Sequence, residues 1–115
     1  MAYYEVHCAD CKRELGEEFQ EVNTWLDEYF KDFGPDHRPL RHHDVAIEKV
    51  REKWGDRAAQ AAEIHIKRDS HGKIPKFEEE FLYAVMKDKV FDALIKEYDG
   101  NQRLAKVIEK FTKKS

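Results

Sequence analysis

Apolar residues recur every three or four positions through most of the chain, which is the spacing of one face of an α-helix. The stripes end at glycine or proline residues and are separated by short polar segments. No run alternates apolar and polar residues with the period of two that is typical of β-strands. The pattern therefore predicts an all-α fold, a compact bundle of about five to six helices in a single helical domain over residues 1–115.

The helix boundaries follow from the stripes and from the residues that interrupt them. A short turn at Gly55-Asp56 predicts that the helices on either side pack as an antiparallel hairpin. The stripe weakens around residues 87–89, so the segment before Tyr98 forms either one long helix or two shorter ones. Asn101 is expected to cap the last helix. The predicted helical segments are residues 3–15, 19–33, 39–54, 56–69, 77–98 and the stretch after 101.

Composition narrows the classes of function. Charged residues make up 39% of the chain but are interspersed, and the net charge is −3 with neutral histidines. Nucleic-acid and membrane-surface binding are not expected, because both require a basic footprint. No apolar run could span a bilayer and no signal peptide opens the chain, so the expected location is cytoplasmic.

Five of the six histidines fall between residues 37 and 71, which makes this region the main candidate for chemistry. His43 lies on the apolar stripe of its predicted helix, and His65 and Asp69 lie one turn apart on the next helix. The hairpin brings the start of the first helix beside the end of the second. We therefore expect His43, His65 and Asp69 to share one ion or one hydrogen-bond network.

Imidazole nitrogen and carboxylate oxygen suit one divalent transition metal such as zinc, iron, manganese or nickel. His42 points about a third of a turn away from His43, as a further ligand or as a solvent-facing neighbour. The guanidinium groups of Arg38 and Arg41 could bind a carboxylate or phosphate anion, or pair with nearby acidic residues. A hydrogen-bonded histidine network without metal remains the alternative for the whole cluster.

Five short segments follow one another between residues 25 and 75. They are Trp25-Leu26-Asp27-Glu28, Phe33-Gly34-Pro35-Asp36-His37-Arg38, Leu40-Arg41-His42-His43, His65-Ile66-Lys67-Arg68-Asp69 and Gly72-Lys73-Ile74-Pro75. In this order they resemble a family of small, mainly helical bacterial and phage proteins of unknown function. That family carries an Arg-His-His motif and a later His-aliphatic-x-x-Asp motif. The resemblance implies that His37, Arg41 and His42 act together with His43, His65 and Asp69, and it adds His37 to the candidate ligands.

A looser resemblance rests on His43-Asp44. It is similar to the metal-binding dyad of the HD phosphohydrolases, which are also helical. Here the pair begins its predicted helix and lacks the usual apolar run before it. The resemblance would make His43 and Asp44 metal ligands.

Cys8 and Cys11 form an isolated CxxC pair on the apolar stripe of the first helix. A structural zinc site needs four ligands, and no second cysteine pair follows. Free cysteine packs as a small apolar residue. We therefore expect both thiols to be reduced and buried.

Two classes of function agree with these observations. The first is a metal-binding helical domain that uses the His/Asp cluster, with hydrolysis as one use of the bound metal. The second is a non-catalytic interaction module that self-associates, as a homodimer, through spare apolar surface. No catalytic residue is assigned from the sequence.

Overall fold

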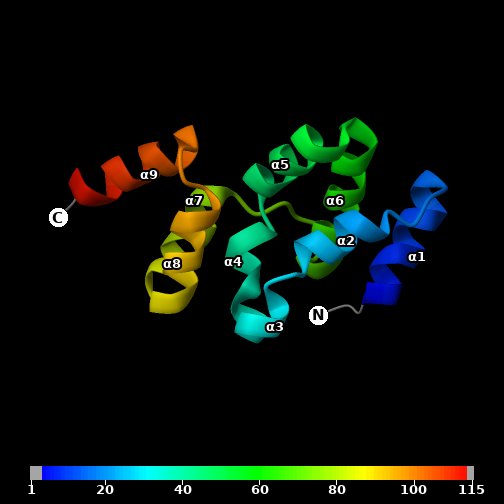
Figure 1. The fold of residues 1–115 in the computed structure, drawn as a ribbon, viewed down its shortest axis with the longest axis horizontal. Coiled ribbons are helices and arrows are strands. Elements are labelled where there is room, and N and C mark those ends of the chain that lie inside the picture. The colour runs from blue at the N-terminus through cyan, green and yellow to red at the C-terminus, as the bar shows by residue number, and fades with distance from the viewer. Residues whose placement is uncertain (1–3, 114–115) are drawn as a thin grey trace.

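The computed structural model describes residues 4–113, and within them every regular element is helical (Figure 1). The expected all-α bundle is confirmed, although the helices outnumber the five to six expected. In chain order the elements are α1 (Tyr4–Leu15), α2 (Gln20–Leu26), α3 (Phe30–Phe33), the 3-10 turn η1 (Gly34–His37), α4 (Arg38–Arg41), α5 (Asp44–Trp54), α6 (Asp56–Asp69), α7 (Phe77–Val85), α8 (Asp88–Glu97) and α9 (Gln102–Lys113).

One hydrophobic core lies among α1, α2, α5 and α6. Four alanines of α6 allow the neighbouring helices to approach closely. The hairpin between α5 and α6 forms as predicted, with Gly55 at φ 97° and ψ −178°, a conformation that residues with a Cβ rarely adopt. The buried residues of this core are Cys11, Val22, Leu26, Ile47, Val50, Ala58, Ala59, Ala61, Ala62 and Ile66.

A second core is formed mainly by α4, α7, α8 and α9, and α9 lies at the opposite end of the molecule from α1 (Figure 1). The Tyr98 hydroxyl donates a hydrogen bond to the Leu40 carbonyl and ties α8 to α4. The amide groups of Arg103 and Leu104 donate to Oδ1 of Asn101, at 2.8 and 3.2 Å, which confirms the predicted cap. The segment between residues 77 and 98 forms two helices, α7 and α8.

The helix expected over residues 39–54 is broken, and this corrects the prediction. His42 leaves the helical conformation at φ −115° and ψ 60°, and His43 is extended. The Ala46 amide donates to Nδ1 of His43 at 3.2 Å, so the His43 side chain caps a new helix that begins at Asp44. The segment 19–33 is also broken, by a turn after Leu26. Both breaks leave a polar side chain, His42 or Asp27, at a helix end.

Cys8 and Cys11 are free thiols with 4% and 0% of their surface exposed, as predicted. The side-chain amide of Asn23 donates to both sulfur atoms at 3.7 Å. Among residues 4–113, no helix has both the length and the apolar character needed to cross a membrane.

Candidate metal centre

Four histidines and two aspartates converge where α1, α2, η1 and the α4–α5 junction meet α6. Each histidine is at most 1% exposed, whereas the Asp27 side chain is 19% exposed. Five separate segments of the chain supply them, so the site exists only in the folded protein. The residues are His7 of α1, Asp27 after α2, His37 of η1, His42 between α4 and α5, and His65 and Asp69 of α6.

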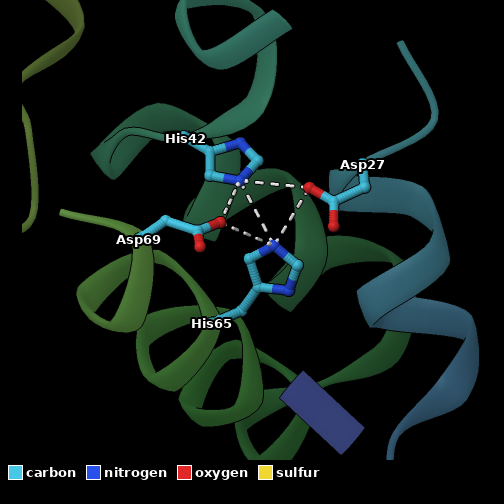
Figure 2. Close-up of side chains that lie close together, drawn as sticks. All are labelled: Asp27, His42, His65 and Asp69. Atoms are coloured by element: carbon cyan, nitrogen blue, oxygen red, sulfur yellow. Dashed lines mark hydrogen bonds and ion pairs between the residues drawn. The ribbon is translucent and has the colours of Figure 1, made fainter. Parts of the chain in front are cut away.

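Four of these side chains form a tight central group (Figure 2). Nε2 of His42 lies 3.2 Å from Nε2 of His65, and 3.3 Å from both Oδ1 of Asp27 and Oδ2 of Asp69. Nε2 of His65 lies 3.2 Å and 3.5 Å from the same two oxygens. A metal with bonds of about 2.1 Å separates neighbouring ligand atoms by roughly 3.0–3.4 Å. Five of the six separations in the group therefore match those of a coordination shell or come within 0.1 Å of them, and all four atoms lie within 4.8 Å of one another.

The orientation of the His65 ring follows from Asn23. The Asn23 side-chain amide donates to the Glu18 carbonyl at 2.9 Å, so its Oδ1 must be the atom that faces His65. That oxygen only accepts, so Nδ1–H of His65 donates to it at 2.9 Å. The neutral His65 ring therefore directs the lone pair of Nε2 into the central group. Outer partners of this kind orient metal-binding histidines.

His37 is oriented in the same way. Its Nδ1–H donates to the Gly34 carbonyl at 2.8 Å, which can only accept. Nε2 of His37 then presents its lone pair toward Oδ1 of Asp27 at 3.2 Å. Asp27 is thus approached by two imidazole nitrogens that carry no proton in the neutral ring.

The charges of the site make these contacts between imidazole lone pairs and carboxylate oxygens still less favourable. Burial alone would raise the pKa of Asp27 and Asp69, but the surrounding histidines hold both values well below the usual range, so both carboxylates are ionised. Burial lowers the pKa of His65 to about 4. Burial also opposes charge on His42, but Asp27 and Asp69 outweigh it and raise the pKa of that ring. Two negative charges therefore lie among imidazoles that are not all able to donate.

His7 is a site residue that the sequence interpretation missed. Its ring stacks on His65 with centroids 3.4 Å apart and an interplanar angle of 13°. Nε2 of His7 lies 3.4 Å from Oδ2 of Asp69 and 3.9 Å from Oδ2 of Asp27. The sequence could have indicated this role, because His7 lies on the apolar stripe of the first helix, one turn before Cys11.

Asp27 and Asn23 were also missed as site residues. They are one turn apart and directly follow the core residues Leu26 and Val22 in the sequence. That spacing places Asn23 on the edge of the buried face of α2, where a polar side chain needs a partner, whereas Asp27 lies just beyond the end of the helix.

The structure brings His37, His42, His65 and Asp69 together, but His43 is not in the central group, which corrects that prediction. The His43 ring packs against Phe77 and Tyr98, with centroids 5.0 and 5.3 Å apart. Burial there lowers its pKa to about 3. The helix break turns the two adjacent histidines in different directions, so His42 occupies the place expected for His43.

The resemblance of His43-Asp44 to a metal-binding dyad is also not supported by the contacts of Asp44. Its Oδ1 accepts from the amide groups of Val45 and Phe77, both at 2.9 Å. Its Oδ2 pairs with Arg103 at 2.8 Å. Asp44 therefore connects α5 with α7 and α9.

Arg41 makes contacts within the fold, and anion binding by this residue stays a prediction. Its guanidinium group donates to the Trp25 carbonyl, Glu28 and Glu97 at 2.8, 3.1 and 2.8 Å. The group also lies 4.0 Å from the centre of the Trp25 ring. The alternative, pairing with Glu28, is confirmed. Anion binding by Arg38, which is half-buried on α4, stays a prediction.

Comparisons of the chain with models of protein families, with curated proteins and with solved structures gave no match. The functional inference therefore rests on the geometry and chemistry of the site.

Proposed function

We propose that this chain is a metal-binding helical domain that holds a divalent transition metal through Asp27, His42, His65 and Asp69. One observation carries the proposal. The buried Nε2 lone pair of His65 faces an ionised carboxylate oxygen and a second imidazole nitrogen, each at 3.2 Å. A cation between these atoms would attract the lone pairs and the carboxylate charge, so that each of these close contacts would become favourable.

A proton network accounts for the same contacts less well. Five contacts of 3.2–3.5 Å join the four central atoms, and a hydrogen bond needs one proton for each contact that it explains. Nε2 of His42 can contribute one proton, and the neutral His65 ring contributes none at Nε2. For the buried Nε2 of His65, the lack of a partner would cost roughly 1–3 kcal/mol. A divalent ion would supply that partner and bind the other three atoms as well.

The donor atoms select the class of metal. Two imidazole nitrogens and two carboxylate oxygens suit zinc, iron, manganese or nickel. The central group contains no sulfur, since the thiols of Cys8 and Cys11 contact the amide of Asn23 instead. The site therefore favours these borderline and harder ions over Cu(I), which prefers sulfur ligands.

Hydrolysis is the reaction class that we attach to this proposal. A metal that accepts a water molecule in addition to its four protein ligands would lower the pKa of that water toward neutrality. Asp27 is the most exposed member of the central group, with 19% of its side chain accessible. Water would therefore approach the metal from the side of Asp27.

The test is the metal content of the protein purified without a histidine tag. We expect stoichiometric zinc, iron, manganese or nickel by plasma mass spectrometry, and its loss in His65→Gln and Asp69→Asn. His71→Asn is the matched control, because His71 is exposed and its positive φ of 55° is tolerated by asparagine. A wild-type protein that stays metal-free after incubation with each ion would contradict the proposal.

A second candidate function is self-association through α7. Leu82 on this helix and Met86 directly after its end are 56% and 82% exposed, although both side chains are largely apolar. A homodimer would bury them. Light scattering coupled to size exclusion should then show a dimer for the wild type and a monomer for Met86→Lys. A monomeric wild type at high concentration would exclude this function.

A further inference from the structure

Two buried histidines are aimed at the central group without belonging to it. His7 and His37 are 0% and 1% exposed, and each directs Nε2 at a carboxylate oxygen of the group. Four ligands are enough for one tetrahedral ion. The two additional imidazoles therefore have no role in a site for a single four-coordinate ion.

His37 lies on the side of Oδ1 of Asp27. In the neutral His37 ring, Nδ1–H donates to the Gly34 carbonyl, and Nε2 faces the Asp27 oxygen at 3.2 Å with its lone pair. Oδ1 of Asp27 is also 3.2 Å and 3.3 Å from the Nε2 atoms of His65 and His42. Three imidazole nitrogens thus surround one carboxylate oxygen, which a cation beside that oxygen would explain.

His7 lies on the side of the other carboxylate oxygen. Its Nε2 is 3.9 Å from Oδ2 of Asp27 and 3.4 Å from Oδ2 of Asp69. Within residues 4–113, neither ring nitrogen of His7 has a hydrogen-bond partner, although the ring is fully buried. A buried imidazole that points at two carboxylates in this way has the position of a further metal ligand.

From these two positions we propose that the cluster holds two divalent ions, with Asp27 as the bridging carboxylate. One ion lies in the central group, with His42, His65 and Oδ1 of Asp27, and gains His37 as a further ligand. The other ion lies beside His7 and Oδ2 of Asp27. Oδ2 of Asp69 faces both ions, since it is 3.3 Å from Nε2 of His42 and 3.4 Å from Nε2 of His7. Paired ions of this kind lie about 3.5–4 Å apart in two-metal sites, where they clamp the oxygens of a substrate between them. The inference rests on the proposed function, because it concerns the same site.

The first test is the stoichiometry of binding. Metal-free protein is titrated with Mn²⁺ and with Zn²⁺ by calorimetry, and the loaded protein is assayed by plasma mass spectrometry. We expect two ions per chain in the wild type and in His71→Asn. His7→Gln and His37→Gln should each bind one ion, while circular dichroism shows that they remain folded. One ion per wild-type chain would overturn the two-ion centre and leave the proposed function intact, whereas no ion would overturn both.

The second test needs no variant. Two Mn²⁺ ions that share a carboxylate couple magnetically, so the paramagnetic resonance spectrum of fully loaded wild type should lack the hyperfine pattern of isolated Mn²⁺. At full loading, a spectrum of isolated ions would place the two ions apart and overturn the bridging role of Asp27. The result does not depend on whether a substituted protein folds.

Discussion

Nδ1–H of His65 donates a hydrogen bond to Oδ1 of Asn23, and this contact at 2.9 Å joins α6 to α2 behind the candidate metal centre. Asn23 is itself held by the Glu18 carbonyl and by two thiols. The pair therefore sets both the tautomer and the direction of the His65 ring.

Replacing Asn23 should weaken metal binding although Asn23 touches no metal. Loss of an outer partner of a ligating histidine typically lowers metal affinity by about 10–100-fold. We expect a loss of this size in Asn23→Ala, measured by competition with a chromophoric chelator. Gln20→Ala, on an exposed position of the same helix, is the control. Equal affinities for both variants and the wild type would show that Asn23 does not position His65.

Metal removal should destabilise the fold, because metal binding free energy counts as folding free energy. At a free metal concentration of 100 times Kd, the stabilisation is about 2.7 kcal/mol. A chelator should therefore lower the Tm of the wild type, and His65→Gln should show no such response. The metal-dependent part of Tm should shrink as pH falls, because His42, whose pKa is raised by Asp27 and Asp69, takes up a proton first, and His65, with a pKa of about 4, takes one up last. A chelator-insensitive wild-type Tm would count against a resident metal.

Glu97 should stabilise the protein in a pH-dependent manner. Burial alone would raise its pKa, but Lys49 at 2.6 Å and Arg41 at 2.8 Å lower it. A carboxyl group with a lowered pKa in the folded state stabilises fully above its ordinary value of 4.5, and the contribution is lost as pH falls below that value. We expect Glu97→Gln to cost about 1–3 kcal/mol at pH 7. Its unfolding free energy, from urea titrations, should also depend less on pH below 4.5 than that of the wild type, and parallel pH profiles would contradict this role.

His43 should matter for stability and not for metal. His43→Ala removes the cap of α5, which costs about 0.5–2 kcal/mol, and also its packing against Phe77 and Tyr98. His43→Asn keeps a capping side chain and should lose less. Both variants should bind metal with wild-type stoichiometry in calorimetry. If the folded His43→Asn variant failed to bind metal, His43 would have to be counted as a metal ligand, contrary to this prediction.

The sequence by itself determined the all-α class, the main helical segments and several of their ends. Apolar spacing is a local property, so the stripe before Gly55, the hairpin at that residue and the cap at Asn101 were all predictable. The same is true of His65 and Asp69, because residues four apart on one helix always share a face. Burial of Cys8 and Cys11 followed from their place on the apolar stripe.

Only the tertiary structure decided which of two adjacent histidines enters the site. Periodicity favoured His43, but the Phe77 amide binds Asp44 and the rings of Phe77 and Tyr98 pack around His43, which stabilises a helix that starts at Asp44. His42 is thereby left in a non-helical conformation and turns toward Asp27 and Asp69.

Tertiary packing likewise decided that His7 and Asp27 belong to the candidate metal centre. His7 is remote from Asp69 in the sequence, and Asp27 lies beyond the end of α2, where helical periodicity no longer predicts the direction of a side chain. Packing of α1 and α2 against α6 brings these residues to His65. Contacts between distant segments depend on how whole helices pack, and no local pattern of apolar and polar residues specifies that packing.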